Sequence, residues 1–428
     1  MKNSSSTAFH RLLSLIVVAT ALVGAVAAGP VTASEAPAAK STAWAGAWGA
    51  AEQPPTGPSF QGPNWSELGF ANHSIRQVVR VSAGGSQLRI RLSNVYGERP
   101  LQLTGATIGA AGEGAAVIPS TIQRLTFSGR AHGVAPAGEM LVSDPVSLTT
   151  APLQRLSVTL YVAQPTGPAT FHEAASATAY RAVGDHRSNT DGTPYLETSH
   201  SWYYLNGVEV SGRQAPRDTV VAFGDSITDG VSSTPDADNR YPDELAERLV
   251  AADRPMGVVN AGISGNRVLN DSPCFGEKAT ARFNRDVLAR PGVRSVIVLE
   301  GINDIQAHMA PFLTCFAPHD EVTAAQLIAG HRALIRAAHA RGVRIIGATI
   351  TPYQGSWFYT DQGEAVRDTV NHWIRTSGEY DAVVDLDRVL ADPENPDQLR
   401  PAYDAGDKLH PNDAGLHAMA EAVDLDSL

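Results

Sequence analysis

The chain is poor in cysteine and in basic residues, and both shortages narrow its possible roles. Among 428 residues there are two cysteines, and 33 lysines and arginines stand against 44 aspartates and glutamates, which gives a net charge of −11. An acidic surface repels phosphate backbones and anionic lipid heads, so we expect no nucleic acid and no stable membrane association. After the first 30 residues no stretch approaches the roughly 20 apolar residues that a membrane span needs.

Residues 1–33 have the composition of a secretory signal peptide. Lys2 and Arg11 precede an apolar run over 12–26, and small residues follow it. The run is too short and too interrupted for a membrane span, although a retained signal anchor stays open as an alternative. The position of signal-peptide cleavage is also left open. Removal of the leader changes the net charge to −13, because it takes away two basic residues and no acid. We therefore expect a secreted, extracellular protein.

The two cysteines are Cys274 and Cys315, both in loop-like contexts with neighbouring phenylalanines. In an oxidising compartment an even pair of cysteines indicates one disulfide. Their spacing does not fit a zinc site, and a catalytic cysteine would be unusual outside the cell. We predict a Cys274–Cys315 disulfide and no metal.

The chain is longer than a single hydrophobic core usually supports, and its pattern of apolar and polar residues changes near residue 218. Residues 44–210 alternate apolar and polar side chains in short runs such as 87–92, with Gly, Pro, Asn and Asp at the turns, which is typical of antiparallel strands. We predict an all-β sandwich or jelly roll for this accessory domain. The polar segment 211–217 is the predicted boundary.

Residues 218–428 alternate buried strands with amphipathic helices. The predicted strands are 219–223, 257–259, 295–299, 344–350 and 382–384, and the predicted helices are 241–252, 279–288, 323–341 and 364–376. This order predicts an α/β fold with a doubly wound parallel sheet. Ligands of such folds lie outside the carboxyl ends of the strands, so chemistry is sought there.

Four polar segments follow these strand ends: 224–230 (GDSITDG), 260–267 (NAGISGNR), 301–304 (GIND) and 407–412 (DKLHPN). Here the chain resembles the GDSL/SGNH hydrolase family, whose four blocks supply a serine, a glycine, an asparagine and a histidine in this order. The resemblance covers about residues 218–425 and implies a flavodoxin-like hydrolase fold. The rival Gly-x-Ser-x-Gly elbow of α/β-hydrolases is absent around Ser226.

The chemistry of each block indicates a serine esterase. Ser226 needs a base to become a nucleophile, and His410 is the predicted base. Asp407, three residues earlier, can hold the other ring nitrogen of His410. The resemblance assigns an oxyanion hole to the backbone N–H groups of Ser226 and Gly262 and to the side-chain amide of Asn303.

The neighbours of these residues have other interpretations. For Asp225, Asp304 and Arg267, capping or structural ion pairing explains the sequence at least as well as catalysis. A loop with Tyr353, Trp357, Phe358 and Tyr359 follows the strand 344–350 and is expected to overhang the cleft, where aromatic faces could stack on a sugar ring or pack an acyl group. Tyr353, Trp357 and Tyr359 are the candidate substrate-binding residues. Plain loop packing explains them equally well.

The run Trp202, Tyr203, Tyr204 is predicted to be interdomain core. We expect an esterase that needs no cofactor and acts on acyl or acetyl esters of carbohydrates, with lipase-like or thioesterase-like hydrolysis as alternatives. A non-catalytic glycan-binding wall protein is the rival of another class. Its mark would be the loss of a triad or oxyanion residue, and none is missing. The sequence does not define the oligomeric state.

Overall fold

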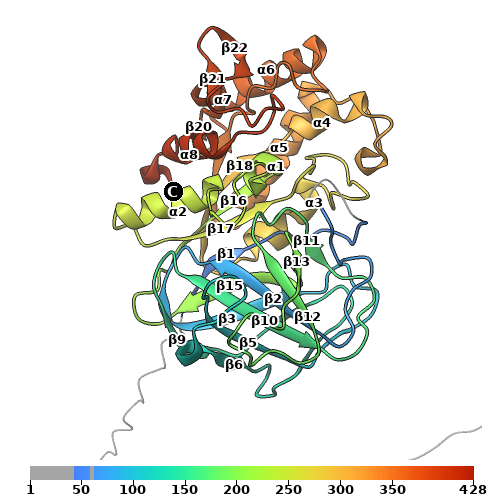
Figure 1. The fold of residues 1–428 in the computed structure, drawn as a ribbon. Helices are drawn as coiled ribbons and strands as arrows, with labels where there is room; N and C mark the ends of the chain where they lie inside the picture. The colour runs from blue at the N-terminus through green and yellow to red at the C-terminus, as the bar shows by residue number, and fades with distance from the viewer. Residues whose placement is uncertain (1–42, 58–61) are drawn as a thin grey trace, which may run out of the picture. The chain divides into compact units, whose positions relative to one another are not determined.

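Two antiparallel sheets make up the first half of the molecule in the computed structural model, which describes residues 43–57 and 62–428 (Figure 1). One sheet has the order β1-β15-β3-β8, with β9 also paired to β3, and the other has the order β13-β12-β2-β10-β5-β6. The first sheet comprises β1 (Trp44–Gly49), β15 (Leu205–Ser211), β3 (Gly85–Ser93), β8 (Met140–Val142) and β9 (Val146–Thr150). The second comprises β13 (Glu197–Ser199), β12 (Ala179–Val183), β2 (His73–Arg80), β10 (Arg155–Val162), β5 (Gly105–Ala110) and β6 (Gln123–Leu125).

Side chains from both sheets form one hydrophobic core. In β3, Leu88, Ile90 and Leu92 are fully buried and alternate with more exposed polar residues, as expected of strands with one buried face. They belong to the same cluster as Leu156 and Val158 of β10 in the other sheet. Two short pairs, β11 (Phe171–His172) with β14 (Trp202–Tyr203) and β4 (Leu101–Leu103) with β7 (Gly133–Ala135), accompany the sheets.

A five-stranded parallel sheet with the order β17-β16-β18-β19-β20 forms the second half. Its strands are β16 (Thr219–Gly224), β17 (Gly257–Gly262), β18 (Val293–Leu299), β19 (Arg344–Ala348) and β20 (Ala382–Val384). Alternate residues of β16 enter different clusters: Val221 and Phe223 pack with α3 (Ala279–Phe283), α5 (Ala324–His339) and α6 (Asp361–Thr376). Val220 and Ala222 pack with α2 (Tyr241–Ala251), α7 (Leu386–Leu390) and α8 (Asp413–Glu421). Helices therefore cover both faces, and the fold is α/β with a parallel sheet.

Most of the predicted elements differ from the structure at one or both ends; the strand predicted over 257–259, for example, extends to Gly262. The helix predicted over 279–288 changes to a π-helix at Asn284–Leu288. The strand predicted over 344–350 ends at Ala348, because the N–H of Ile350 leaves the ladder and donates to Asn371 Oδ1 at 2.7 Å. Short helices α1 (Ser226–Asp229) and α4 (Ile302–Gln306) follow β16 and β18. The two-stranded pair β21 (Ala391–Asp392) and β22 (Asn395–Leu399) precedes the loop that leads to α8.

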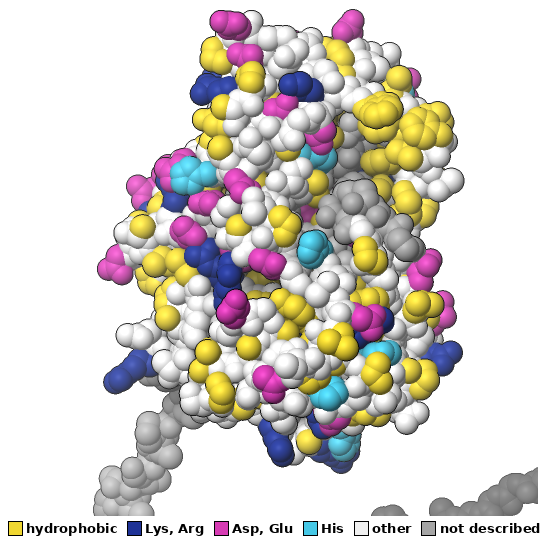
Figure 2. Space-filling view, viewed as in Figure 1, with side chains coloured by type: hydrophobic (Ala, Val, Ile, Leu, Met, Phe, Trp, Pro, Cys, Tyr) yellow, Lys and Arg dark blue, Asp and Glu magenta, His cyan; other side chains and the backbone are white. Residues whose placement is uncertain are grey.

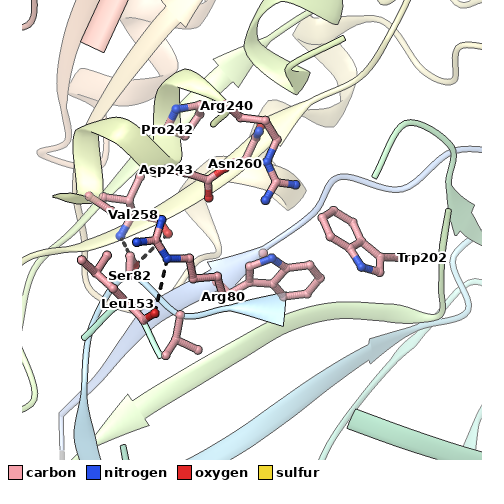
Figure 3. Close-up of a pocket in the computed structure, with 13 residues that line it drawn as sticks. Arg80, Ser82, Leu153, Trp202, Arg240, Pro242, Asp243, Val258 and Asn260 are labelled. Atoms are coloured by element: carbon pink, nitrogen blue, oxygen red, sulfur yellow. Dashed lines mark hydrogen bonds and ion pairs between the residues drawn. The ribbon is translucent and has the colours of Figure 1, made fainter. Parts of the chain in front are cut away.

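The two halves meet across a polar seam, and residues 42–428 form one compact unit. Ser82 Oγ accepts the N–H of Val258 at 2.7 Å, and Gly46 donates to Thr219 Oγ1 at 3.0 Å. Figure 3 shows the residues around a small cavity of about 20 Å³ in this seam, with Trp202 from the first half and Arg240 from the second. Trp202 lines this cavity, and Trp202, Tyr203 and Tyr204 all belong to the hydrophobic core of the first half.

The division into a domain over 44–210 and another over 218–428 stays a prediction, although β15 ends and β16 begins on either side of 211–217. The predicted signal peptide lies outside the described residues. Within the described part of the chain, no helix combines the length and the apolar character that a membrane crossing requires.

Candidate active site

Ser226 occupies the first position of α1, directly after β16 ends. Asp225 is the N-cap of this helix, and its side chain accepts the N–H of Ile227 at 3.0 Å. This sharp strand-to-helix turn places Ser226 at the carboxyl edge of the parallel sheet, where 6% of its surface is exposed. A serine held here can meet a base that arrives from another loop.

The loop before α8 supplies that base. Nε2 of His410 lies 2.9 Å from Oγ of Ser226, and Nδ1 lies 2.6 Å from Oδ2 of Asp407. The other oxygen of Asp407 accepts the backbone N–H groups of Leu409 at 2.9 Å and His410 at 2.8 Å. The structure therefore brings the three predicted triad residues into one chain of hydrogen bonds.

The charge of Asp407 is stabilised by this arrangement. Partial burial favours the neutral carboxyl group, but the hydrogen bond and the charge of the His410 ring outweigh it, and they lower the pKa of Asp407 to about 2. A carboxylate that accepts from Nδ1 fixes the tautomer in which Nε2 can accept a proton from the serine.

Asn303 lies in α4, one turn after β18. Its Nδ2 donates to the carbonyl oxygen of Asn266 at 3.0 Å, and its Oδ1 accepts from Gln306 Nε2 at 3.2 Å. These two bonds fix the orientation of the amide. The second hydrogen on Nδ2 has no partner among the described residues, and Asn303 lines the same cavity as Ser226 and His410.

Gly262 does not have the geometry that its predicted role requires. Its N–H donates to Asn260 Oδ1 at 2.9 Å, so it is not available to an oxyanion, and Gly262 does not line the cavity. A Cβ atom at this position would run into the backbone of Thr228 and Asp229. The glycine is required because β17 packs closely on α1, which is a structural reason.

Gly265, three residues later, has the geometry that was expected of Gly262. It lines the cavity together with Ser226, and its N–H forms no hydrogen bond within the described residues. Its φ of 75° lies in the left-handed region, and a Cβ atom would meet the ring of Phe275. The segment 260–267 contains two glycines, and the sequence pattern alone did not separate the packing glycine from the turn glycine.

The neighbouring charged residues act structurally. Asp304 accepts the N–H groups of Val268 at 2.7 Å and Leu269 at 3.0 Å, and burial raises its pKa to about 6. Burial also raises the pKa of the helix-capping Asp225 to about 7.

Two buried arginines hold the loops around the site. Arg267 donates to carbonyl oxygens of Asp271 and of three residues over 316–318, which ties two loops together. Arg282, which the sequence did not single out, donates to the carbonyl oxygens of Gly224 and Ala261 and thereby joins the ends of β16 and β17.

A cavity of about 590 Å³ opens beside Ser226 and His410. The predicted disulfide is confirmed, with Cα atoms of Cys274 and Cys315 5.0 Å apart, and both cysteines line this cavity. Apolar side chains make up much of the remaining wall: Phe275, Phe312, Leu313, Phe316, Phe358 and Leu409. Figure 2 shows hydrophobic side chains gathered on the side of the molecule where the segment after α4 runs in Figure 1.

The three predicted substrate-binding aromatics are not in the cavity wall. Tyr353 is fully buried and packs against Tyr359 in the core, with ring centroids 5.1 Å apart. Trp357 is 91% exposed and does not line the cavity. Phe358, between them in sequence, does line it. Without the loop conformation, the sequence could not show which of four neighbouring aromatic side chains turns toward Ser226.

One group of acids among the described residues has spacing suited to a metal ion: Glu364, Asp368 and Asp397. All three carboxylates lie around the guanidinium group of Arg367, with Asp397 at 3.7 Å and Asp368 at 3.8 Å. A buried cation already balances this cluster, so it does not suggest a metal centre.

A parallel α/β sheet that presents a hydrogen-bonded serine, histidine and aspartate at its carboxyl edge is an arrangement that serine hydrolases use. Residues 222–418 match the GDSL-like lipase/acylhydrolase family, and this part of the chain is a domain of that family. The protein is accordingly a carboxylic ester hydrolase. No curated protein matches the chain.

Solved structures with similarity to the chain align with about half of it. A lipolytic protein of the G-D-S-L family from Desulfitobacterium hafniense DCB-2 is 22% identical, covering 48% of this chain and 96% of its own, with a TM-score of 0.36. The acetylxylan esterase Axe2 from Geobacillus stearothermophilus is 24% identical, covering 49% of this chain and 93% of its own, with a TM-score of 0.37. The aryl esterase of M. smegmatis is 16% identical, covering 48% of this chain and 95% of its own, with a TM-score of 0.38. At these TM-scores the family assignment rests on residues 222–418 alone.

Proposed function

We propose that this protein is a secreted serine esterase in which Ser226, His410 and Asp407 form the catalytic triad. The observation that carries the proposal is the 2.9 Å contact between Ser226 Oγ and His410 Nε2, with Asp407 on the other ring nitrogen. A serine hydroxyl is a weak nucleophile unless a base accepts its proton, and this contact supplies the base.

The reaction proceeds in two halves. Ser226 Oγ attacks the ester carbonyl carbon while its proton passes to Nε2 of His410, and the tetrahedral intermediate collapses when His410 protonates the leaving alcohol. Water then attacks the acyl-enzyme with His410 as base, and the carboxylic acid leaves Ser226. Asp407 stabilises the imidazolium in both halves.

The oxyanion hole consists of the backbone N–H groups of Ser226 and Gly265 and the free N–H of Asn303. All three residues line the cavity, and none of these three N–H bonds is taken up by another group in the described part of the chain. Such donors stabilise the negative charge that develops on the carbonyl oxygen, each by about 3–4 kcal/mol.

The substrate class that we propose is acyl esters of carbohydrates. The cavity is large enough for a sugar unit with its acyl group, and it combines phenylalanine rings with polar side chains such as Gln306 and Thr314. Flat aromatic faces can stack on sugar rings while polar side chains bind hydroxyl groups.

A second candidate is the hydrolysis of esters with larger apolar acyl groups. It is favoured by the exposed apolar side chains at the cavity, since Phe312 is 67% exposed and Leu313 36% exposed. A long acyl chain would cover this surface.

The two candidates separate in a substrate panel. We expect purified protein to hydrolyse p-nitrophenyl acetate and Ser226→Ala to lose nearly all of that activity, and full activity of Ser226→Ala would contradict the esterase mechanism. Acetylated xylooligosaccharides are compared with p-nitrophenyl esters of increasing acyl length. A kcat/KM that falls steeply beyond short acyl groups supports carbohydrate esters, and one that rises with acyl length supports the second candidate. Secretion is tested by the N-terminal residue of the exported protein.

A further inference from the structure

We infer that the first half of the molecule takes part in catalysis through His172, which acts as a positioning residue that holds Asp229 and, through it, the Ser264–Gly265 turn of the oxyanion hole. The inference rests on the proposed function of Ser226. It assigns a role in the reaction to a residue outside the 222–418 family domain.

The link is a continuous chain of hydrogen bonds. Nε2 of His172, on β11, lies 3.0 Å from Oδ1 of Asp229, at the end of α1. The other carboxylate oxygen of Asp229 accepts the N–H of Ser264 at 2.9 Å. Ser264 directly precedes Gly265, so the position of the Gly265 N–H depends on where Asp229 stands.

His172 is itself firmly placed. Its Nδ1 lies 2.8 Å from the carbonyl oxygen of Ala51, and its ring stacks on Trp202 with centroids 5.4 Å apart. Only 3% of its surface is exposed. The ring is therefore held on one face and at one nitrogen by the first half of the molecule, while its other nitrogen points to the second half.

The hydrogen-bond partners of the two ring nitrogens indicate the charge of His172. A carbonyl oxygen and a carboxylate oxygen both accept, so both nitrogens of His172 must donate, which makes the ring an imidazolium. Although burial disfavours the charged ring, the carboxylate of Asp229 raises the pKa of His172 above its ordinary value.

The first half also contributes directly to the cavity. Thr56, Gly57 and Glu173 line it together with Ser226, and Glu173 follows His172 in the chain. The N–H of Glu173 donates to Gln53 Oε1 at 3.0 Å, and Nε2 of Gln53 donates to the carbonyl oxygen of Cys274 at 3.2 Å. The same short segment thus reaches the cavity wall and the oxyanion turn.

The test compares four variants of the full chain: His172→Ala, Asp229→Ala, Asp229→Asn and Ser82→Ala. Asp229→Asn is the conservative variant, because its Oδ1 can still accept from Ser264 and its Nδ2 can donate to a neutral His172. Ser82→Ala is the matched control, since it removes a buried hydrogen bond to Val258 in the same seam but away from the oxyanion turn. For each variant kcat and KM for p-nitrophenyl acetate are measured below the lowest Tm.

We expect Asp229→Ala and His172→Ala to lower kcat by about tenfold to a hundredfold with KM changed little, since misplacement of one donor acts on the transition state. Asp229→Asn should keep kcat within about threefold of wild type, as the hydrogen bonds rather than the charge position the turn. Ser82→Ala should lower Tm and leave kcat unchanged.

The inference is overturned if Asp229→Ala and His172→Ala have the kcat of Ser82→Ala, or if Asp229→Asn loses as much activity as Asp229→Ala. If the alanine variants do not fold, His172→Gln replaces them, because it keeps a donor for only one of the two acceptors and should lower kcat; a wild-type kcat in His172→Gln also overturns the inference. An active Ser226→Ala would refute the proposed function, whereas an inactive Ser226→Ala with a normal Asp229→Ala would refute only the positioning role.

Discussion

Asp407 is bonded to His410 twice: its Oδ2 lies 2.6 Å from the ring nitrogen Nδ1, and its Oδ1 accepts the backbone N–H of the same residue at 2.8 Å. One carboxylate thereby fixes both the conformation of the loop and the orientation of the His410 ring. We expect Asp407→Asn to lower kcat by roughly 10²- to 10⁴-fold, because the amide no longer selects the tautomer that accepts the serine proton.

Asp404→Asn is the control for this variant. Asp404 accepts the N–H groups of Gly406 at 2.8 Å and Lys408 at 3.0 Å, so it holds the same loop without touching the ring. Steady-state kinetics should show a small change for Asp404→Asn. Equal losses in the two variants would mean that loop stability, and not the tautomer, explains the effect.

The pH dependence of stability should reflect the carboxylate of Asp407. The pKa of Asp407 is about 2, so this carboxylate stays charged above about pH 4, and its contribution to stability is lost only as the pH falls from its unfolded value near 3.8 toward 2. The free energy of unfolding should therefore fall as the pH is lowered from about 4 toward 2, and Asp407→Asn should lack this loss because it has no carboxylate to protonate. Urea unfolding of wild type and Asp407→Asn across this pH range tests this, and the same pH dependence in both proteins would contradict it.

Asn303→Ala should lower kcat by about a hundredfold to a thousandfold with little change in KM or Tm, since its free N–H stabilises charge only in the transition state. A change confined to KM would assign Asn303 to ground-state binding instead. The comparison with Gln306→Ala is informative, because Gln306 orients the Asn303 amide at 3.2 Å. That variant should show a smaller loss.

Replacement of Cys274 and Cys315 by serine should lower the free energy of unfolding by about 2–4 kcal/mol, because the bridge closes a long loop. Activity on p-nitrophenyl acetate should persist, since neither sulfur contacts the triad. Activity on larger esters should change in KM, because both cysteines line the cavity. Thiol titration of the native protein should find none, and two reactive thiols would contradict the disulfide.

Stability should also depend on Glu52, which is 1% exposed and has both carboxylate oxygens without a partner among the described residues. Burial raises its pKa from 4.5 to about 8, so the native state keeps this proton while the unfolded chain releases it. The free energy of unfolding therefore falls as the pH rises from about 4.5 to 8. In urea unfolding, the free energy of unfolding of Glu52→Gln minus that of wild type should be larger at pH 8 than at pH 5. The same difference at both pH values would contradict this.

The sequence predicted the parallel sheet and the meeting of Ser226 and Asn303, because the hydrophobic runs mark the strands and the carboxyl ends of parallel strands share one edge. His410 follows β22, which lies outside the parallel sheet, so strand order alone does not explain its place beside Ser226. The sequence could not show which of Gly262 and Gly265 has a backbone N–H free for the oxyanion. That depends on the side chain of Asn260, whose Oδ1 accepts the N–H of Gly262. Loop conformation decided which aromatic faces the cavity.

The seam was harder still to predict. His172 and Asp229 are 57 residues apart in the sequence, one on β11 in the first half and the other at the end of α1 in the second half, and no local pattern relates them. A lone histidine in a β-rich segment carries no sign of its partner. Contacts of this kind depend on how two separately patterned halves pack, which periodicity does not encode.

Covalent labelling tests directly whether Ser226 is the nucleophile. The full chain is treated with phenylmethylsulfonyl fluoride, which sulfonylates activated serines, and the modified residue is located by peptide mass spectrometry. We expect one adduct per chain, on Ser226, with loss of esterase activity in proportion to labelling, and greatly slowed labelling in His410→Ala. An unlabelled Ser226 in an inhibited enzyme, or full activity of a chain labelled at Ser226, would contradict it.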